Sequence, residues 1–156
     1  MMVTAIQDKI EREVVYPQPI ERVWSALTEP DQLKQWFGSK TAEIDLRPGG
    51  TMHLVWEGMT ARAIVETVNP TSYFSWRWKP GSAKDDLTRP LAEQEPLTLV
   101  EFTLETAAGG TRLRVVESGF AAFDESTRIA ALSQNNEGWD GCLKGLAALL
   151  GGEDGR

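Results

Sequence analysis

The clearest hydrophobic pattern in the chain lies between Ser126 and Leu150. Seven positions here recur at alternating spacings of three and four residues, which places them on one face of an α-helix: Ile129, Leu132, Asn136, Trp139, Leu143, Leu146 and Leu150. Six of the seven are apolar, so the pattern predicts one long helix with a buried face. Gly138, Gly141 and Gly145 each cost roughly 1 kcal/mol relative to alanine inside a helix. Their small size favours a helix that is pressed into a concave sheet.

The N-terminal pattern predicts one strand followed by two short helices. Residues 10–16 are rich in β-branched and aromatic side chains, and this strand ends at Pro17. We expect Pro19 to occupy the first position of a helix, where its missing N–H is harmless. Pro30 suits the start of a second helix, and Gly38 is expected to end it.

From residue 42 to residue 117 the hydrophobic period changes to two, which is the period of a β-strand. Strands are predicted over residues 42–47, 51–57, 61–68, 72–78, 97–106 and 111–117. In the last three strands the apolar residues share one face: Phe74, Trp76, Trp78, Val100, Phe102, Leu104, Leu113 and Val115. Charged residues alternate with them, so the pattern predicts a sheet with one buried and one wet face.

Residues 79–96 interrupt the regular succession of strands. The segment contains three prolines and a glycine and exceeds ordinary connection lengths. We interpret it as either a lid over a site or a mobile excursion. No internal repeat is visible, so we expect a single domain over residues 1–156, with a core at 8–150 and a flexible tail at 151–156.

Several short motifs resemble those of a known family. They are Pro19 to Trp24, Leu27-Thr28-Glu29-Pro30 followed by Leu33 and Trp36, Asp45 to Gly50, Gly110-Thr111-Arg112-Leu113, and Gly138-Trp139 with Leu143 and Leu146. Together they resemble the single-domain relatives of the activator of heat-shock protein 90 ATPase, over about residues 8–150. That family belongs to the START-like, helix-grip superfamily, also called SRPBCC.

The resemblance implies an α+β fold of the birch-pollen-allergen type. In that fold a seven-stranded curved antiparallel sheet wraps around a long C-terminal helix, often with a cavity between them, and two short helices follow the first strand. Members of the superfamily bind lipids, sterols or polyketides, and some act as cyclases. Because fold does not determine function, these activities are expectations only.

Composition and charge narrow the classes of partner. The chain has 16 basic and 23 acidic residues and a formal net charge of -7, which argues against nucleic acid or an anionic membrane as a partner. Cys142 is the only cysteine, so no intrachain disulfide can form. Residues 1–9 lack the apolar run of a signal peptide, and no stretch approaches the ~20 apolar residues of a membrane span. We therefore expect a cytoplasmic protein, either a monomer or a homodimer.

Six tryptophans are the outlier in the composition, and five of them precede residue 80. Their large rings either line an aromatic pocket or fill the core in place of a ligand. Trp24 and Trp139, set among leucines at helical spacing, favour the core. The candidate cavity residues are Trp36, His53, Trp56, Phe74, Trp76, Trp78, Phe102, Asn136 and Trp139.

Three polar residues are candidates for a chemical role. Asn136, the polar member of the helical stripe, either bonds to the sheet backbone or points into a polar part of a cavity. His53, the single histidine, is best interpreted as a partly exposed strand residue and cannot form a metal site alone. Arg12 is expected to pair with Glu101 or Glu43 at the rim of the sheet.

Cys142 is expected to be a small buried hydrophobe, because a thiol nucleophile needs an activating base. No motif for a metal, a phosphate loop or a nucleophilic serine is present in the sequence. We therefore predict no catalytic residue, no metal and no cofactor.

The family resemblance implies, as our first hypothesis, binding of a small hydrophobic ligand, lipid-like, aromatic or polyketide-like, in a cavity between the sheet and the C-terminal helix. The first alternative is a chaperone-associated or regulatory protein-interaction module, which an exposed apolar patch in place of a cavity would favour. The second is a polyketide cyclase-like or hydrolase enzyme, which a water-accessible acid–base pair inside the cavity would favour.

Overall fold

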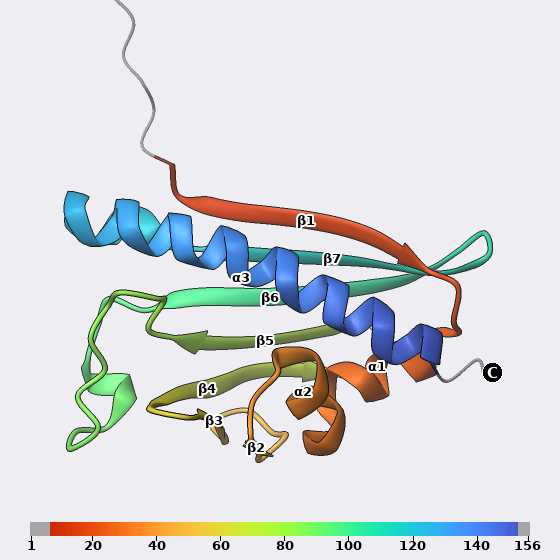
Figure 1. The fold of residues 1–156 in the computed structure, drawn as a ribbon, viewed down its shortest axis with the longest axis horizontal. Coiled ribbons are helices and arrows are strands. Elements are labelled where there is room, and N and C mark those ends of the chain that lie inside the picture. The colour runs from red at the N-terminus through yellow and green to blue at the C-terminus, as the bar shows by residue number, and fades with distance from the viewer. Residues whose placement is uncertain (1–6, 153–156) are drawn as a thin grey trace, which may run out of the picture.

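The computed structural model of the chain describes residues 7–152 and contains one antiparallel sheet and one long helix (Figure 1). The elements in chain order are β1 (Lys9–Tyr16), α1 (Ile20–Thr28), α2 (Pro30–Phe37), β2 (Thr41–Ile44), β3 (Thr51–Trp56), β4 (Met59–Asn69), β5 (Tyr73–Trp78), η1 (Leu91–Glu93), β6 (Thr98–Ala107), β7 (Gly110–Ser118), η2 (Phe120–Ala122) and α3 (Glu125–Gly152). The predicted tail at 151–156 begins inside α3, and its residues 153–156 lie outside the described residues.

The seven strands form one sheet in the order β1-β7-β6-β5-β4-β3-β2, and every neighbouring pair is antiparallel. Helix α3 runs across one face of the sheet, and α1 and α2 lie beside its C-terminal half (Figure 1). The predicted helix-grip architecture is therefore confirmed. Because α2 packs against both α3 and β2, it closes one side of the space between helix and sheet.

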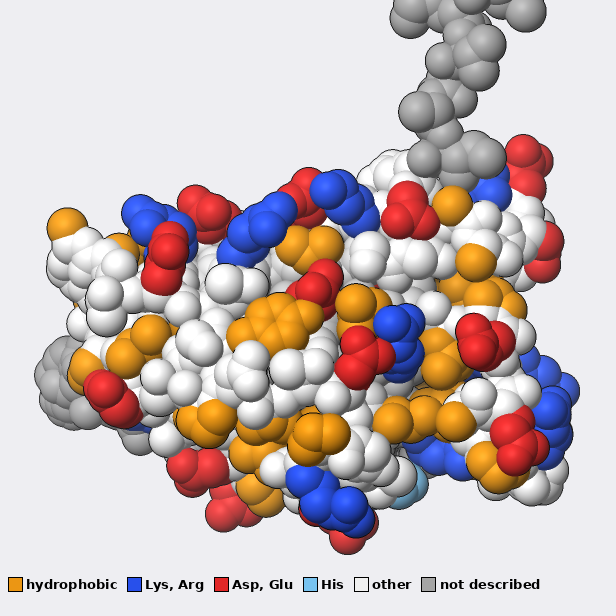
Figure 2. Space-filling view, turned by 180° about the vertical axis from the view of Figure 1, so that it is seen from behind, with side chains coloured by type: hydrophobic (Ala, Val, Ile, Leu, Met, Phe, Trp, Pro, Cys, Tyr) orange, Lys and Arg blue, Asp and Glu red, His pale blue; other side chains and the backbone are white. Residues whose placement is uncertain are grey.

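The period-two pattern of the central strands positions the core. The inward side chains of β5, β6 and β7 are almost fully buried and face α3: Phe74, Trp76, Val100, Phe102, Leu104, Leu113 and Val115. Acidic and basic side chains are interspersed on the opposite face of the sheet. Figure 2 shows the molecule from that side. Arg112 pairs there with Glu13 and Glu105, and Arg114 pairs with Glu11. The prediction of one buried and one wet face is confirmed.

The prediction that Ile129 belongs to the buried stripe of the helix is wrong. Ile129 is 60% exposed, whereas Trp139, Leu143, Leu146 and Leu150 are buried as predicted. The stripe repeats every 3.5 residues, but a straight α-helix repeats every 3.6, so the stripe drifts by about 20° per heptad. Over the three heptads that separate Ile129 from Leu150, this drift turns the N-terminal position out of the core.

Most element boundaries differ from the prediction by one to three residues, and two of these differences are described here. Pro19 is not the first residue of α1 but its N-cap, in an extended conformation. Strand β2 ends at Ile44 because the following residues fold back in a tight turn. In that turn Gly50 lies so close to Asp45 that an added Cβ would stand 2.0 Å from the Asp45 carbonyl oxygen. Pro30 opens α2 and Gly38 ends it in the left-handed region, both as predicted.

The glycines of α3 have different surroundings. A Cβ added at Gly145 would lie 2.8 Å from the Trp36 carbonyl oxygen, so here the helix does press on its neighbour. A Cβ added at Gly138 or Gly141 would meet nothing within 4 Å. The predicted close approach of the helix is therefore right for one glycine and wrong for the other two, which border open space.

We expect Gly138→Ala and Gly145→Ala to change stability in opposite directions. Alanine at position 138 gains helix propensity without a clash and should raise the free energy of unfolding by about 1 kcal/mol. Alanine at position 145 must displace backbone atoms of Trp36 and should lower it by about 1–2 kcal/mol. Urea denaturation of both variants measures the difference, and equal shifts would show that α3 is not gripped at Gly145.

Candidate functional site

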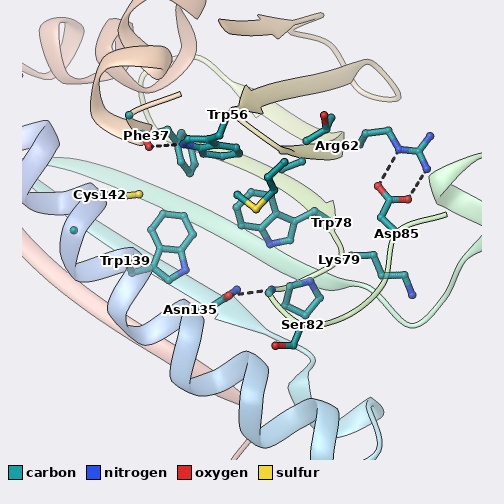
Figure 3. Close-up of a pocket in the computed structure, with 18 of the residues that line it drawn as sticks. Phe37, Trp56, Arg62, Trp78, Lys79, Ser82, Asp85, Asn135, Trp139 and Cys142 are labelled. Atoms are coloured by element: carbon teal, nitrogen blue, oxygen red, sulfur yellow. Dashed lines mark hydrogen bonds and ion pairs between the residues drawn. The ribbon is translucent and has the colours of Figure 1, made fainter. Parts of the chain in front are cut away.

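A pocket of about 710 Å³ lies between α2, α3, the β3–β4 hairpin and the segment that follows β5 (Figure 3). Five aromatic side chains line it and form what we call the aromatic wall: Trp36, Phe37, Trp56, Trp78 and Trp139. Gly138 and Gly141 also line it, because their missing side chains leave room beside the helix. The space predicted between sheet and helix is therefore present, and it lies near the C-terminal end of β5.

The tryptophans on the α2 side of the pocket have their indole N–H groups bonded to backbone. The N–H of Trp36 donates to the carbonyl oxygen of Ala26 at 2.7 Å. The N–H of Trp56 donates to the carbonyl oxygen of Phe37 at 3.3 Å. These bonds fix the rings, and they leave only apolar ring surface for anything that enters the pocket.

The other two indoles of the wall are bonded to a single carboxylate. Trp78 and Trp139 donate their N–H groups to the two oxygens of Glu117, at 2.9 and 2.8 Å. The amide of Asn135 donates to both oxygens at 2.8 and 3.0 Å, and the Thr98 hydroxyl donates at 2.6 Å. Glu117 is fully buried. Because every partner is a donor, the site suits a carboxylate, which only accepts hydrogen bonds.

Asn135 also connects this cluster to the segment after β5. Its side-chain oxygen accepts a hydrogen bond from the backbone N–H of Gly81 at 3.0 Å (Figure 3). A Cβ on Gly81 would lie 2.5 Å from the Gln134 side-chain oxygen and 2.9 Å from that of Asn135. A larger residue at position 81 would have to displace these two side-chain ends, so glycine favours the close approach of the segment to α3.

The rest of the segment between β5 and β6 is anchored at the far side of the pocket. Arg62 on β4 forms two hydrogen bonds to Asp85, at 2.5 and 2.9 Å, and both side chains are largely buried. The hydrogen bond from Arg62 lowers the pKa of Asp85, and the same bond raises the pKa of Arg62. Gln94 is buried and bonds to both backbone groups of Asp86, while Leu91 packs inward. The segment thus has defined contacts on two sides.

We expect Asp85→Asn to loosen this segment while leaving the sheet intact. Loss of the charged partner of Arg62 should speed amide hydrogen exchange in residues 82–94 about tenfold, which equals about 1.4 kcal/mol of local opening free energy. Because the pKa of Asp85 is lowered, the pair stabilises the wild type above about pH 3.9 and is lost as the pH falls below that value. Unchanged exchange at pH 7 would contradict the anchor.

Hydrogen exchange of Asp124→Asn is the matched control. Asp124 is a similar carboxylate with a lowered pKa, held by Thr127 and Ser126 just before α3 and far from the segment in sequence. Its replacement should affect the first turn of α3 and leave exchange in residues 82–94 unchanged.

The structure separates the predicted cavity residues into groups. Trp36, Trp56, Trp78 and Trp139 lie on the pocket surface. Three others are packed behind the wall with almost no exposed surface and do not line the pocket: Phe74, Trp76 and Phe102. Their rings contact one another at centroid distances of 5.0 to 5.9 Å, so they fill the core in place of a ligand.

His53 and Asn136 also lie outside the pocket surface. His53 is flanked by the buried Met52 and Leu54, so strand alternation turns it to the other face of the sheet, where its register neighbours are Glu43 and Arg62. This placement matches the interpretation of His53 as a partly exposed strand residue.

Asn136 belongs to a contact between α3 and the edge strand β1. Its side-chain oxygen accepts a hydrogen bond from Arg12 at 2.9 Å, and its amide donates to the Leu132 carbonyl at 2.8 Å. Arg12 also pairs with Asp140 at 2.8 Å. The expected partners of Arg12, Glu101 and Glu43, are therefore wrong, because β1 lies beside α3 and its arginine reaches the helix.

The sequence pattern did not predict two central residues of the site. Glu117 and Asn135 hold the wall and the segment after β5 together. The signal for Glu117 was present: it follows Leu113 and Val115 at the same strand parity. A charged side chain on an inward-facing position must have buried partners. Asn135 carried no such signal, because only its neighbour Asn136 falls on the helical stripe.

Among residues 7–152, no cluster of three His, Cys, Asp or Glu side chains suits a metal ion. Cys142 lies on the pocket surface, and burial raises the pKa of its thiol to about 12, so it stays protonated near neutral pH. Within the described part of the chain, no helix is long and apolar enough to cross a membrane.

A family model described as "Activator of Hsp90 ATPase homolog 1-like protein" matches residues 17–151. Among solved structures, protein MLL2253 of Mesorhizobium loti is 24% identical with a TM-score of 0.73, covering 91% of this chain and 96% of that one. The Aha1 dimer of Colwellia psychrerythraea is 22% identical with a TM-score of 0.68, covering 92% and 96%.

DynU16, a protein of the dynemicin biosynthetic locus, is 23% identical with a TM-score of 0.71, and the match covers 93% of this chain but 48% of DynU16. At these identities the likeness to solved structures shows the fold alone. A search of curated proteins finds no match to the chain.

Proposed function

The chain belongs to the Activator of Hsp90 ATPase homolog 1-like family, and we propose that this member binds a small hydrophobic ligand in the pocket bounded by the aromatic wall. The observation that carries the proposal is the state of the pocket tryptophans. All four indole N–H groups are bonded to protein atoms, so the ring surface that borders the pocket is apolar. Such surface gains free energy when an apolar molecule covers it.

The size and the mouth of the pocket support the same proposal. A volume of about 710 Å³ lies within the usual range for sites that hold a drug-sized molecule. Met59 and Leu87 border the pocket and are 56% and 58% exposed, which is unusual for large apolar side chains. Their position suits a mouth through which an apolar molecule enters.

The pocket supports ligand binding ahead of the two alternatives. A flat apolar patch in place of a hollow would have favoured a protein-interaction module. An enzyme of the cyclase or hydrolase type needs an acid and a base that are free to act on a substrate. Arg62 and Asp85 line the pocket, but they are bonded to each other. Polyketide-like molecules belong in the ligand panel because members of the superfamily that the chain resembles bind lipids, sterols or polyketides.

The test is a titration followed by tryptophan emission. The panel contains fatty acids, flavonoids, a polycyclic aromatic polyketide and an apolar dye. We expect at least one compound to change the emission below about 100 μM, which corresponds to roughly 5.5 kcal/mol of binding free energy. No change with any compound at that concentration would overturn the proposal.

A pair of glycine variants places the binding event in the pocket. Gly141→Leu puts a side chain into the hollow, where an added Cβ meets nothing within 4 Å, and should weaken binding at least about tenfold. Gly151→Leu adds the same side chain to the same helix at a position that is also open but outside the pocket. Equal affinities of the two variants would show that the ligand binds elsewhere.

A further inference from the structure

We propose that the ligand of this pocket is an organic cation, a quaternary or protonated amine attached to an apolar body. The inference rests on the proposed function and adds the charge of the ligand to it. Two observations carry it. A buried carboxylate without a basic partner stands behind the aromatic wall, and the wall presents ring faces, which attract cations.

The first observation is the charge of Glu117. Its five hydrogen bonds come from two indoles, an amide and a hydroxyl, all of which are neutral. Within residues 7–152 it forms no ion pair with a basic side chain. Hydrogen bonds stabilise the carboxylate but leave its net charge in place. In the low dielectric of the core, that charge acts over several ångströms and reaches the pocket.

The second observation is the geometry of the wall. The ring centroids of Trp78 and Trp139 are 6.3 Å apart, and Phe37 lies 6.2 and 6.3 Å from them. Indole is the aromatic ring that binds cations best. Because both indoles donate their N–H groups to Glu117, electron density moves toward the ring faces that border the pocket. A cation resting on the wall contacts more than one ring.

Two basic groups, Arg62 and Lys79, also line the pocket, and the charge of Lys79 acts against a cationic ligand. Arg62 is neutralised by Asp85. The ammonium group of Lys79 donates to the Pro96 carbonyl at 3.2 Å and lies 5.8 Å from the centre of the Phe123 ring. Figure 3 shows Arg62 and Lys79 on the far side of Trp78 from Trp139. The acidic Glu137 also borders the pocket, and its charge offsets that of Lys79.

A matched pair of probes tests the charge directly. Benzyltrimethylammonium and neopentylbenzene have the same shape and differ by one nitrogen in place of one carbon. We would titrate both into the wild-type protein, following tryptophan emission, with the cation up to about 10 mM because such small molecules bind weakly, and with the hydrocarbon up to its solubility limit. We expect the cation to bind about tenfold more tightly, a difference of about 1.4 kcal/mol. Tighter or equal binding of the neutral probe would overturn the inference.

Glu117→Gln tests the source of the preference. This variant keeps one acceptor oxygen but removes the charge, so the cation should lose about tenfold more affinity than the neutral probe. If both probes weaken equally, Glu117 only shapes the wall and the inference fails. If the variant does not fold, the affinities of the two probes for the wild-type protein still test whether the pocket prefers a cation. If only neopentylbenzene binds, the inference of a cationic ligand is wrong and the proposed function stands. If neither probe and no compound of the ligand panel changes the emission, both the inference and the proposed function are wrong.

Discussion

Trp139→Ala is expected to lower the free energy of unfolding by about 3–5 kcal/mol, the range for a buried large aromatic residue. Trp139 is almost fully buried where α3 meets the sheet, and its ring contacts Phe37, Trp78 and Phe102. The substitution removes these contacts and also one of the donors that hold Glu117. Denaturation in urea, with the midpoint and slope compared to wild type, measures the loss.

Trp139→Phe is the matched control for this variant. It keeps an aromatic ring in the contact but removes the indole N–H together with part of the ring, so it separates these two losses from the loss of the whole side chain. We expect a loss of about 1–3 kcal/mol, the range for a hydrogen bond to a charged group or for a buried acceptor that loses a partner. A midpoint of Trp139→Ala equal to that of wild type would show that α3 is not held at this position.

Glu117→Leu is expected to cost about as much, roughly 3–5 kcal/mol, although leucine is the more hydrophobic residue. The change leaves four buried or half-buried donors without their acceptor: the side chains of Trp78, Thr98, Asn135 and Trp139. Each unsatisfied donor carries a desolvation cost of about 1–3 kcal/mol, offset in part by repacking. Urea denaturation again gives the number.

Glu117→Gln serves as its partner variant, because the amide oxygen still accepts from some of these donors. The expected order of stability is wild type, then Glu117→Gln, then Glu117→Leu. If Glu117→Leu is the most stable of the three, the carboxylate is not the centre that holds the wall, and the electrostatic argument for a cationic ligand loses its basis.

The helix-grip fold was predictable because it depends on periodicity. The inward alternation of Phe74 and Trp76, and of Leu113 and Val115, indicates the buried face of the sheet without knowledge of any partner. The C-terminal stripe locates α3 and its buried residues from Trp139 onward. The prediction for Ile129 was wrong because a strict seven-residue repeat drifts around a straight helix. Over three heptads this drift turns Ile129 out of the core.

The pocket was less predictable, because it depends on where long-range neighbours meet. Alternation assigns Trp76 and Trp78 to the same face of β5, yet Trp76 is enclosed by Phe74 and Phe102 while Trp78 ends the strand and faces the hollow. No local pattern distinguishes the two. The predicted partners of Arg12 were wrong for the same reason, because its ion pair with Asp140 joins residues near opposite ends of the chain.

The central claim, that a ligand rests on the aromatic wall, is tested most directly by fluorine NMR of protein labelled with 5-fluorotryptophan. The six tryptophans give separate signals that single Trp→Phe variants assign. On addition of a ligand that changes the emission, we predict shifts for Trp56, Trp78 and Trp139, which line the pocket, and none for Trp24, which does not. A shift of Trp24 with unchanged signals from Trp78 and Trp139 would contradict the account.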